Sequence, residues 1–422
     1  MSAVNAAASV APAPVPKQFP DSARAPAPDP APAPDPAPAP DRVAATVPDA
    51  TCSTASASAA DRLPLIEAAR GLAACLIVAH HLTAYGPLPD IAENVALGPI
   101  RFLYDYARMV VYVFLVIGGF ALATSIRIER RSGGAMRTFV WRYLRIGLPC
   151  GAMLAMLLAT SLVTRSGAFD PPLIESVSGP QLIAHLFFLQ DLLGYGNISA
   201  GIWYLCIDMQ FAALYLLVVA LGRVVSDRVR PEIATGQIVM AILFPLGIWS
   251  AWDWNRDPSG DSMLFYFLAP LVLGVGLAFW WQRSLSTSLF AMLVLAEGLS
   301  LAVDFRWRLA LAVATVILLA LTMRSPIINR LAVPLMPLGR TSYSLFLIHY
   351  LVNWIVTTSL AGFVEASPWR AVAVMLVAFA CSLSMAVLFY RFVEQPVQRW
   401  ARNWRPAESS RQTSKPVILV EV

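Results

Sequence analysis

Long apolar stretches recur from Leu63 to about residue 391, and short polar segments separate them. An α-helix needs about 17 to 25 mostly apolar residues to cross a hydrocarbon layer of about 30 Å. The pattern therefore predicts an all-α fold, a polytopic bundle of about ten membrane-spanning helices. The predicted spans are residues 63–84, 107–126, 146–164, 203–222, 235–252, 262–281, 287–303, 308–323, 343–360 and 371–391.

The composition agrees with a lipid environment. Of the 422 residues, 58% are hydrophobic and 14% are charged, which is too apolar for a soluble domain. The net charge of +5 comes mainly from arginines that are scattered between apolar stretches. Because they form no single basic stripe, we expect no nucleic acid as a partner. The apolar composition predicts that membrane lipid is a partner.

Three regions follow from the same pattern. Residues 1–60 are rich in Ala, Pro, Ser and Asp and predict a disordered tail without a signal peptide, which we expect in the cytosol. Residues 61–400 form the membrane domain, and 401–422 a short cytosolic tail. Most loop arginines fall on the side of the 127–145 loop, so this loop and both termini are predicted to be cytoplasmic.

Arg70 and His81 both lie inside the first predicted span. They are eleven positions apart, so they share one helix face, within about 20° and about 16 Å of rise. Ionisable groups inside a membrane indicate function by default. The alternatives are that Arg70 is a cytosolic anchor and that His81 is a hydrogen-bonded structural residue.

A second intramembrane histidine, His349, lies in the segment LGRTSYSLFLIHY. It is either a packing residue or part of the same cavity as His81. The four histidines show no spacing typical of a metal site, so we predict no metal. The five cysteines are read as packing residues.

The 127–145 loop, RIERRSGGAMRTFVWRYLR, concentrates arginine beside the membrane. This reflects either the positive-inside rule with anionic lipid, or a site where Arg142 and Arg145 bind a phosphorylated donor such as coenzyme A. The chain contains no glycine-rich phosphate loop.

Two acids accompany these basic groups. Asp208 lies in the segment WYLCIDMQF of the fourth predicted span and could orient an imidazole or a substrate hydroxyl, or pair with another helix. Trp203 opens the same segment. Glu394 precedes Pro396 at the end of the last helix, either as a structural lock or as a catalyst.

The stretch RLPLIEAARGLAACLIVAHHL resembles the first helix of the acyltransferase-3 family of membrane O-acyltransferases, whose signature is an arginine, ten residues and a histidine. Arg70 and His81 fit this spacing. Further matching segments follow in family order: VYVFLVIGGF at 111–120, FVWRYLRIGLP at 139–149, WYLCIDMQF at 203–211, FYFLAPLVLGVGLA at 265–278, LGRTSYSLFLIH at 338–349 and YRFVEQPVQR at 390–399. The chain departs from the family at Gly118, Tyr112 and Asp208, where serine, an acid and glutamate are common.

The resemblance implies an enzyme of the bacterial inner membrane that moves an acyl group, usually acetyl, from cytosolic acyl-CoA to a hydroxyl of an exported or envelope glycan. Acyl-CoA is then a co-substrate, and no cofactor is permanently bound. His81, with Arg70 and His349, would be catalytic. Arg142 and Arg145 would bind the donor, and Asp208 and Trp203 the acceptor.

Two alternatives remain at this point. One is acylation of a small molecule by the same chemistry. The other is a transporter or flippase that uses the intramembrane Arg and His residues, although the sequence shows no clear internal repeat.

Overall fold

The computed structural model describes residues 63–126, 135–164, 173–174, 177–365 and 367–401. These residues form helices, turns and loops without any strand, which confirms the predicted all-α class. The tail predicted at 1–60 lies outside the described residues, as do residues 127–134 of the arginine-rich loop and all but the first residue of the tail at 401–422.

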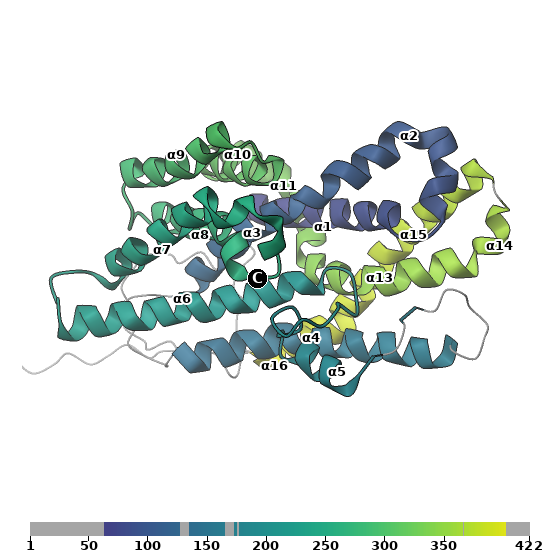
Figure 1. Cartoon of the computed structure of the whole chain (residues 1–422), viewed down its shortest axis with the longest axis horizontal. Helices are drawn as coiled ribbons and strands as arrows, with labels where there is room; N and C mark the ends of the chain where they lie inside the picture. Colours follow the sequence, from purple (N-terminus) through teal and green to yellow (C-terminus); the bar gives the residue numbers. More distant parts are fainter. Residues whose placement is uncertain (1–62, 127–134, 165–172, 175–176, 366, 402–422) are drawn as a thin grey trace, which may run out of the picture. The chain divides into compact units, whose positions relative to one another are not determined.

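Figure 1 shows the arrangement of the helices. The longer helices are α1 (Pro64–Ala84), α2 (Leu88–Tyr106), α3 (Val111–Ser125), α4 (Ala135–Thr164), α6 (Ile202–Arg228), α7 (Thr235–Trp252), α8 (Leu264–Trp281), α9 (Thr287–Val303), α10 (Trp307–Thr322), α13 (Ser342–Ser359) and α15 (Pro368–Phe389). Shorter helices connect them: η2 (Ala107–Val110), α5 (Gly179–Leu186), η3 (Trp254–Arg256), η4 (Pro258–Gly260), α11 (Pro326–Ala332), η5 (Val333–Leu335), α12 (Met336–Arg340), α14 (Ala361–Val364), η6 (Tyr390–Glu394) and α16 (Gln395–Ala401).

Seven helical runs in the described ranges are long and apolar enough to cross a membrane. They are Pro64–Ala84, Leu88–Ser125, Ala135–Thr164, Ile202–Arg228, Thr235–Arg256, Leu264–Trp281 and Pro368–Ala401. An eighth span results if α10 and the following α11–α12 segment count as one, since a bend of 114° separates them. The chain is therefore a multi-pass membrane protein.

The predicted count of about ten spans is not confirmed. Each predicted segment contains a helix, but α9 has only 17 residues. Helix α13 has 18 residues, and the polar side chains of Ser342, His349 and Asn353 dilute its apolar character. Polar groups that line a protein interior lower mean hydropathy without preventing membrane insertion, so counting apolar residues misses such helices.

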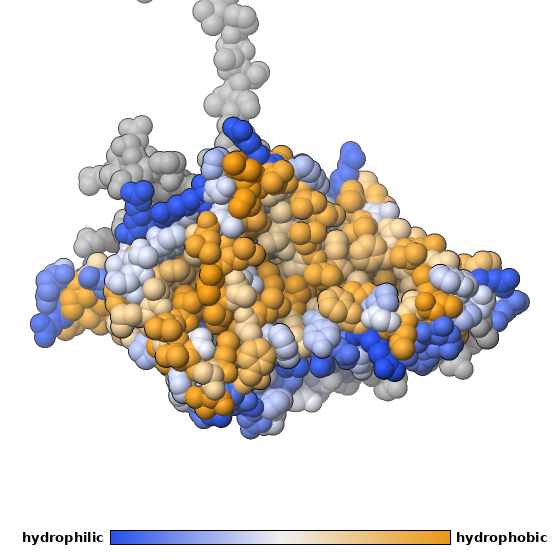
Figure 2. Space-filling model, turned by 90° about the horizontal axis from the view of Figure 1, so that it is seen from above, coloured by the Kyte–Doolittle hydropathy of each residue, from blue (hydrophilic) through white to orange (hydrophobic). Residues whose placement is uncertain are grey.

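Apolar side chains also cover much of the outer surface. Figure 2 shows apolar residues over most of the face in view, with polar residues at its margins. Leu217, Leu318 and Leu321 are 66%, 61% and 76% exposed. A surface of this kind is stable where lipid, not water, surrounds the protein.

Glycines bring the helices that carry the candidate site into backbone contact. A Cβ atom on Gly339 of α12 would clash with the carbonyl oxygen of Glu67 on α1, and one on Gly71 would clash with the backbone of α12. Small residues allow such close approach in membrane proteins. The contact places the start of α13 beside the first half of α1.

The end of α1 is defined by a sharp turn. Tyr85 is extended, and Gly86 has a φ of 81°, a conformation that residues with a side chain rarely adopt. Pro87 then leads into α2, which is bent at Ala96 (φ −134°, ψ 35°). Because of this bend, visible in Figure 1, the second half of α2 returns to the end of α1, where the carbonyl oxygen of Leu103 lies 3.1 Å from a nitrogen of His80.

Candidate functional site

Two histidines from different helices meet at the centre of the candidate site. Nδ1 of His81 on α1 lies 2.6 Å from Nε2 of His349 on α13. The rings are nearly parallel, with centroids 4.9 Å apart and an interplanar angle of 13°. His349 is fully buried, whereas His81 is partly exposed. The pair therefore presents one accessible imidazole, supported from behind by a second.

The hydrogen bonds of His349 determine where the protons lie. Its Nδ1 faces the carbonyl oxygens of Phe346 and Leu345, at 2.8 Å and 3.1 Å. Carbonyl oxygens only accept, so Nδ1 of His349 carries a proton and Nε2 of the neutral ring is an acceptor. His81 must then donate from Nδ1, which leaves its Nε2 with a lone pair. This is the tautomer that a general base requires.

A partly open pocket is lined on α1 by Arg70, and neither histidine of the pair is among its lining residues. Its lining on α1 includes Ile77, four residues before His81, and its lining on α13 includes Phe346, three residues before His349. Residues with these spacings share a helix face. The remaining lining residues are Val111, Phe114, Arg145, Ile146, Tyr204, Leu205, Asp208, Ser342, Tyr343, Glu394 and Gln398.

Arg70 lines the pocket at the end far from His81. Its Nη2 donates to Oγ of Ser342 at 3.0 Å, and its Nη1 lies 3.5 Å from Oε1 of Glu67. The side chain of Arg70 is 11% exposed. Its guanidinium is thus held within the protein, which argues against a role as a surface anchor alone. Arg70 does not contact His81.

Arg145 and Glu394 form another charged part of the lining. Arg145 lies over the ring of Trp141, 5.6 Å from its centroid. Glu394 ends the π-helical turn η6, accepts from the hydroxyl of Ser344, and accepts from Gln398 at 2.8 Å. Single π-helical turns are frequent at functional sites because they redirect one side chain. Here Glu394 is turned into the pocket.

Arg142 and Asp208 form a buried ion pair. Both carboxylate oxygens of Asp208 accept from Nη2 of Arg142, at 2.6 Å and 2.8 Å. The two side chains are 6% and 8% exposed. Asp208 lines the pocket but Arg142 does not. Of the two arginines predicted to bind the donor, only Arg145 faces the pocket.

The remaining predicted residue, Trp203, is not among the residues that line the pocket. Its ring lies 5.3 Å from that of Phe267 on α8. Ser342 and Phe346 line the pocket but were not predicted from the sequence as site residues. Their spacing could have indicated them, since Ser342, Phe346 and His349 stand at positions i, i+4 and i+7 of one helix face.

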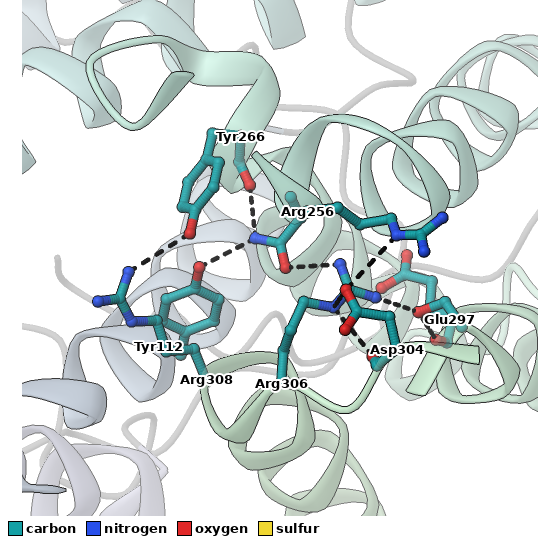
Figure 3. A network of polar contacts seen from close by, with 9 residues as sticks. Tyr112, Arg256, Tyr266, Glu297, Asp304, Arg306 and Arg308 are labelled. Carbon is teal, nitrogen blue, oxygen red and sulfur yellow. Dashed lines mark hydrogen bonds and ion pairs between the residues drawn. The ribbon is translucent and has the colours of Figure 1, made fainter. Parts of the chain in front are cut away.

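A separate polar network lies outside the pocket lining, as Figure 3 shows. Nδ2 of Asn255 donates to the hydroxyl of Tyr112 at 3.0 Å and to the carbonyl oxygen of Tyr266 at 2.8 Å. Arg306 donates to Oδ1 of Asn255 at 3.1 Å and to the hydroxyl of Ser300 at 2.9 Å. The network connects α3, α8 and α9 to the residue that precedes α10. Tyr112, at a family position where an acid is common, thus has a structural partner.

Glu297 lies next to this network on α9 (Figure 3). Its side chain is fully buried, and neither carboxyl oxygen has a hydrogen-bond partner among the described residues. An isolated buried carboxylate is very costly, so the neutral, protonated form is favoured there.

His185 on α5 is a structural residue. Its Nδ1 lies 2.8 Å from the carbonyl oxygen of Gln181, and its Nε2 accepts from the backbone N–H of Ile198 at 3.1 Å. Burial lowers the pKa of His185 below its ordinary value. The ring is therefore held neutral and joins α5 to the loop that leads to α6.

Comparison with known protein families gives a match over most of the chain. Residues 64–387 match a family model, Acyl_transf_3, that is described as an acyltransferase domain. No curated protein and no solved structure matches the chain. The matched range begins at the first residue of α1 and contains both histidines of the pair.

Proposed function

The chain belongs to the acyltransferase-3 family, and on this premise we propose that it moves an acyl group, taken here as acetyl, from cytosolic acyl-CoA to a hydroxyl of an envelope or exported glycan. The coarser activity, that of a membrane acyltransferase, follows from the family. The donor, the acceptor and the roles of individual residues are part of the proposal.

The observation that carries it is the hydrogen-bonded His81–His349 pair, which lies one helical turn beyond the pocket-lining residues Ile77 and Phe346. A general base has to lie within hydrogen-bond reach of the hydroxyl that it deprotonates. Nε2 of His81 has the lone pair for this step, and the ring is partly exposed. Because Ile77 and Phe346 line the pocket one turn before the two histidines, a thioester bound there would lie near His81.

The reaction is direct transfer with balanced protons. Nε2 of His81 accepts the proton of the acceptor hydroxyl while the hydroxyl oxygen attacks the carbonyl carbon of the thioester. The tetrahedral intermediate then expels the coenzyme A thiolate, which takes the proton from Nε2. The products are an ester and free coenzyme A, and His81 returns to its starting state. Throughout the cycle, Nε2 of His349 accepts a hydrogen bond from the Nδ1–H group of His81. This hydrogen bond stabilises the transient imidazolium of His81.

Arg70 and Arg145 are the proposed donor-binding residues, because both residues line the pocket. Arginine suits phosphate recognition through paired charge-assisted hydrogen bonds. Arg142 instead holds Asp208 in position within this proposal. Asp208 remains a candidate for contact with the acceptor, because it lines the pocket. Trp203 packs on Phe267, which favours a structural role for Trp203 over contact with the acceptor.

The proposed location is the bacterial inner membrane, with the 127–145 loop and both termini in the cytoplasm. Loop arginines support this orientation through the positive-inside rule. Arg145, at the cytosolic end of α4, would then meet coenzyme A from the compartment that contains it.

One structural feature favours a second candidate function. The 114° bend between α10 and α11–α12 resembles the broken helices of transporters. A flippase for a glycan or small molecule is therefore the alternative. Acylation of a small molecule remains the alternative within the family chemistry.

Purified protein in lipid nanodiscs, given labelled acetyl-CoA and envelope glycan from a strain that lacks this gene, tests the proposal. We expect label on the glycan with wild type and a loss of at least about 100-fold with His81→Ala. Leu76→Ala is the control, because Leu76 is 40% exposed on the same helix.

Sealed proteoliposomes separate the second candidate. Movement of glycan across the bilayer without label transfer, and unchanged by His81→Ala, would favour the flippase. Label on an added small alcohol but not on glycan would favour the small-molecule acceptor.

A further inference from the structure

Three tyrosines lie near the two histidines at the end of α1, and one of them, Tyr85, lies next to His81 itself. The ring of Tyr85 lies 5.5 Å from that of His81 and meets Tyr350 edge to face at 5.8 Å. The ring of His80 lies 5.3 Å from that of His81 and 6.1 Å from that of Tyr104. We call Tyr85, Tyr104 and Tyr350 the aromatic surface.

Three separate segments build the aromatic surface. Tyr85 caps α1 immediately before the turn at Gly86, and Tyr350 follows His349 on α13. Tyr104 arrives from α2 because the bend at Ala96 returns that helix toward His80. Because of these two turns of the chain, Tyr85 lies beside His81, Tyr350 beside Tyr85, and Tyr104 beside His80.

The tyrosines are available to a ligand. Tyr85 and Tyr104 are 51% and 50% exposed, and Tyr350 is partly exposed. No hydrogen bond within the described part of the chain involves any of their three hydroxyl groups, which are therefore available to a polar ligand.

The order of residues along α1 separates two directions of approach to His81. Ile77 lines the pocket, His81 follows one turn later, and Tyr85 one turn after that. An acyl carbon delivered through the pocket and a hydroxyl delivered over the aromatic surface would meet at the same imidazole. Transfer between two substrates needs this convergence.

We infer that the aromatic surface is the acceptor subsite and that it binds a sugar ring; this inference rests on the function proposed above. A sugar ring exposes C–H groups on its faces, whose positive ends are attracted by the negative face of an aromatic ring. Its hydroxyl groups lie at the ring edge, where tyrosine hydroxyls can bond to them and where one can reach His81. A hydrocarbon chain would make no use of the three hydroxyl groups.

The test uses the full chain in nanodiscs, labelled acetyl-CoA, and envelope polysaccharide from a strain lacking the gene, freed of O-acetyl groups by mild alkali. Tyr85→Ala and Tyr104→Ala should each raise the KM for polysaccharide about three- to tenfold. The KM for acetyl-CoA should stay unchanged, and Tyr85→Phe should keep most of the affinity because the ring remains.

Tyr106→Ala is the matched control, since Tyr106 lies on the same helix, is 49% exposed and contacts Phe102 instead of a histidine. A KM for polysaccharide that is unchanged in Tyr85→Ala and Tyr104→Ala would overturn the inference and leave these tyrosines as membrane-interface anchors.

Direct binding of the polysaccharide without acetyl-CoA separates this inference from the proposed function. If wild type transfers no label but binds polysaccharide more tightly than Tyr85→Ala, sugar binding by the aromatic surface stands and the transferase proposal fails. If transfer occurs and neither binding nor KM responds to the tyrosine variants, the reverse is true.

Discussion

His81 and His349 are 268 positions apart in the sequence, yet their ring nitrogens lie 2.6 Å from each other. The backbone carbonyl groups of Leu345 and Phe346 fix the proton of His349, and His349 in turn fixes the proton of His81. A neutral residue thus performs the orienting task that a carboxylate has in many hydrolases.

We predict that His349→Ala lowers kcat by about 100-fold or more while the KM for acetyl-CoA changes little. Loss of the acceptor at Nε2 frees His81 to rotate and to adopt the wrong tautomer, an error that is costly in related constellations. Initial rates of label transfer over a range of pH values measure the effect.

His349→Gln is the matched variant, because a glutamine carbonyl can accept the same hydrogen bond. It should recover a measurable part of kcat relative to His349→Ala. Equal rates for wild type and His349→Ala would contradict the assigned role.

We predict that Arg145→Ala raises the KM for acetyl-CoA at least about tenfold, because a charge-assisted hydrogen bond to phosphate contributes about 1.5 to 3 kcal/mol. The effect should weaken as salt is added. Arg230→Ala is the control, since Arg230 is 64% exposed and pairs with exposed Glu232. A KM that responds equally to both substitutions would argue against a specific donor site.

The Arg142–Asp208 pair should matter mainly for stability. Asp208→Leu leaves a buried guanidinium without its partner and should lower the free energy of unfolding by about 3–5 kcal/mol. The double variant Arg142→Met with Asp208→Leu removes both charges and should regain much of this loss. Thermal unfolding in detergent measures both. A double variant no more stable than Asp208→Leu alone would contradict this account.

Periodicity was sufficient to predict parts of this structure. The segment 235–252 was predicted with the bounds of α7, and 262–281 nearly with those of α8, because both are continuous apolar runs with polar ends. The shared face of Arg70 and His81 also followed from helix geometry. Each of these features depends only on residues that are close in sequence.

Contacts between distant segments could not be predicted in this way. Nothing within α4 indicates that Arg142 pairs with Asp208 while Arg145, three residues later, faces the pocket. The rotation of α4 about its own axis relative to α6 decides which of the two arginines pairs with Asp208. Glu394 was similarly ambiguous, since its direction depends on the π-helical turn before Pro396.

Stability should fall at mildly acid pH because of His185. Burial lowers its pKa, so below the ordinary pKa of about 6.5 the unfolded chain binds a proton that the folded chain does not. The free energy of unfolding should therefore decrease as pH falls from about 7 to 5, by at most about 1.4 kcal/mol per pH unit. His185→Gln, a neutral residue with a donor and an acceptor, should flatten this dependence in unfolding measurements. An unchanged slope would contradict this prediction.

Glu297 is expected to be dispensable for folding. Because its buried carboxyl group has no hydrogen-bond partner in the part of the chain that the structure describes, Glu297→Met should leave the unfolding temperature unchanged or raise it. Asn255→Ala, which breaks the neighbouring network, should instead cost about 1–3 kcal/mol. A Glu297→Met variant that folds but loses activity would assign this acid a functional role.

The close packing of Gly339 against Glu67 has a consequence for how the pocket can open. With no Cβ between them, the backbones of α1 and α12 interlock, and neither helix can slide along the other. The wall that carries Arg70 and Ser342 is therefore rigid. Other lining residues lie on helices outside this contact, among them Arg145 on α4 and Gln398 on α16, and we expect any opening of the pocket to involve these helices.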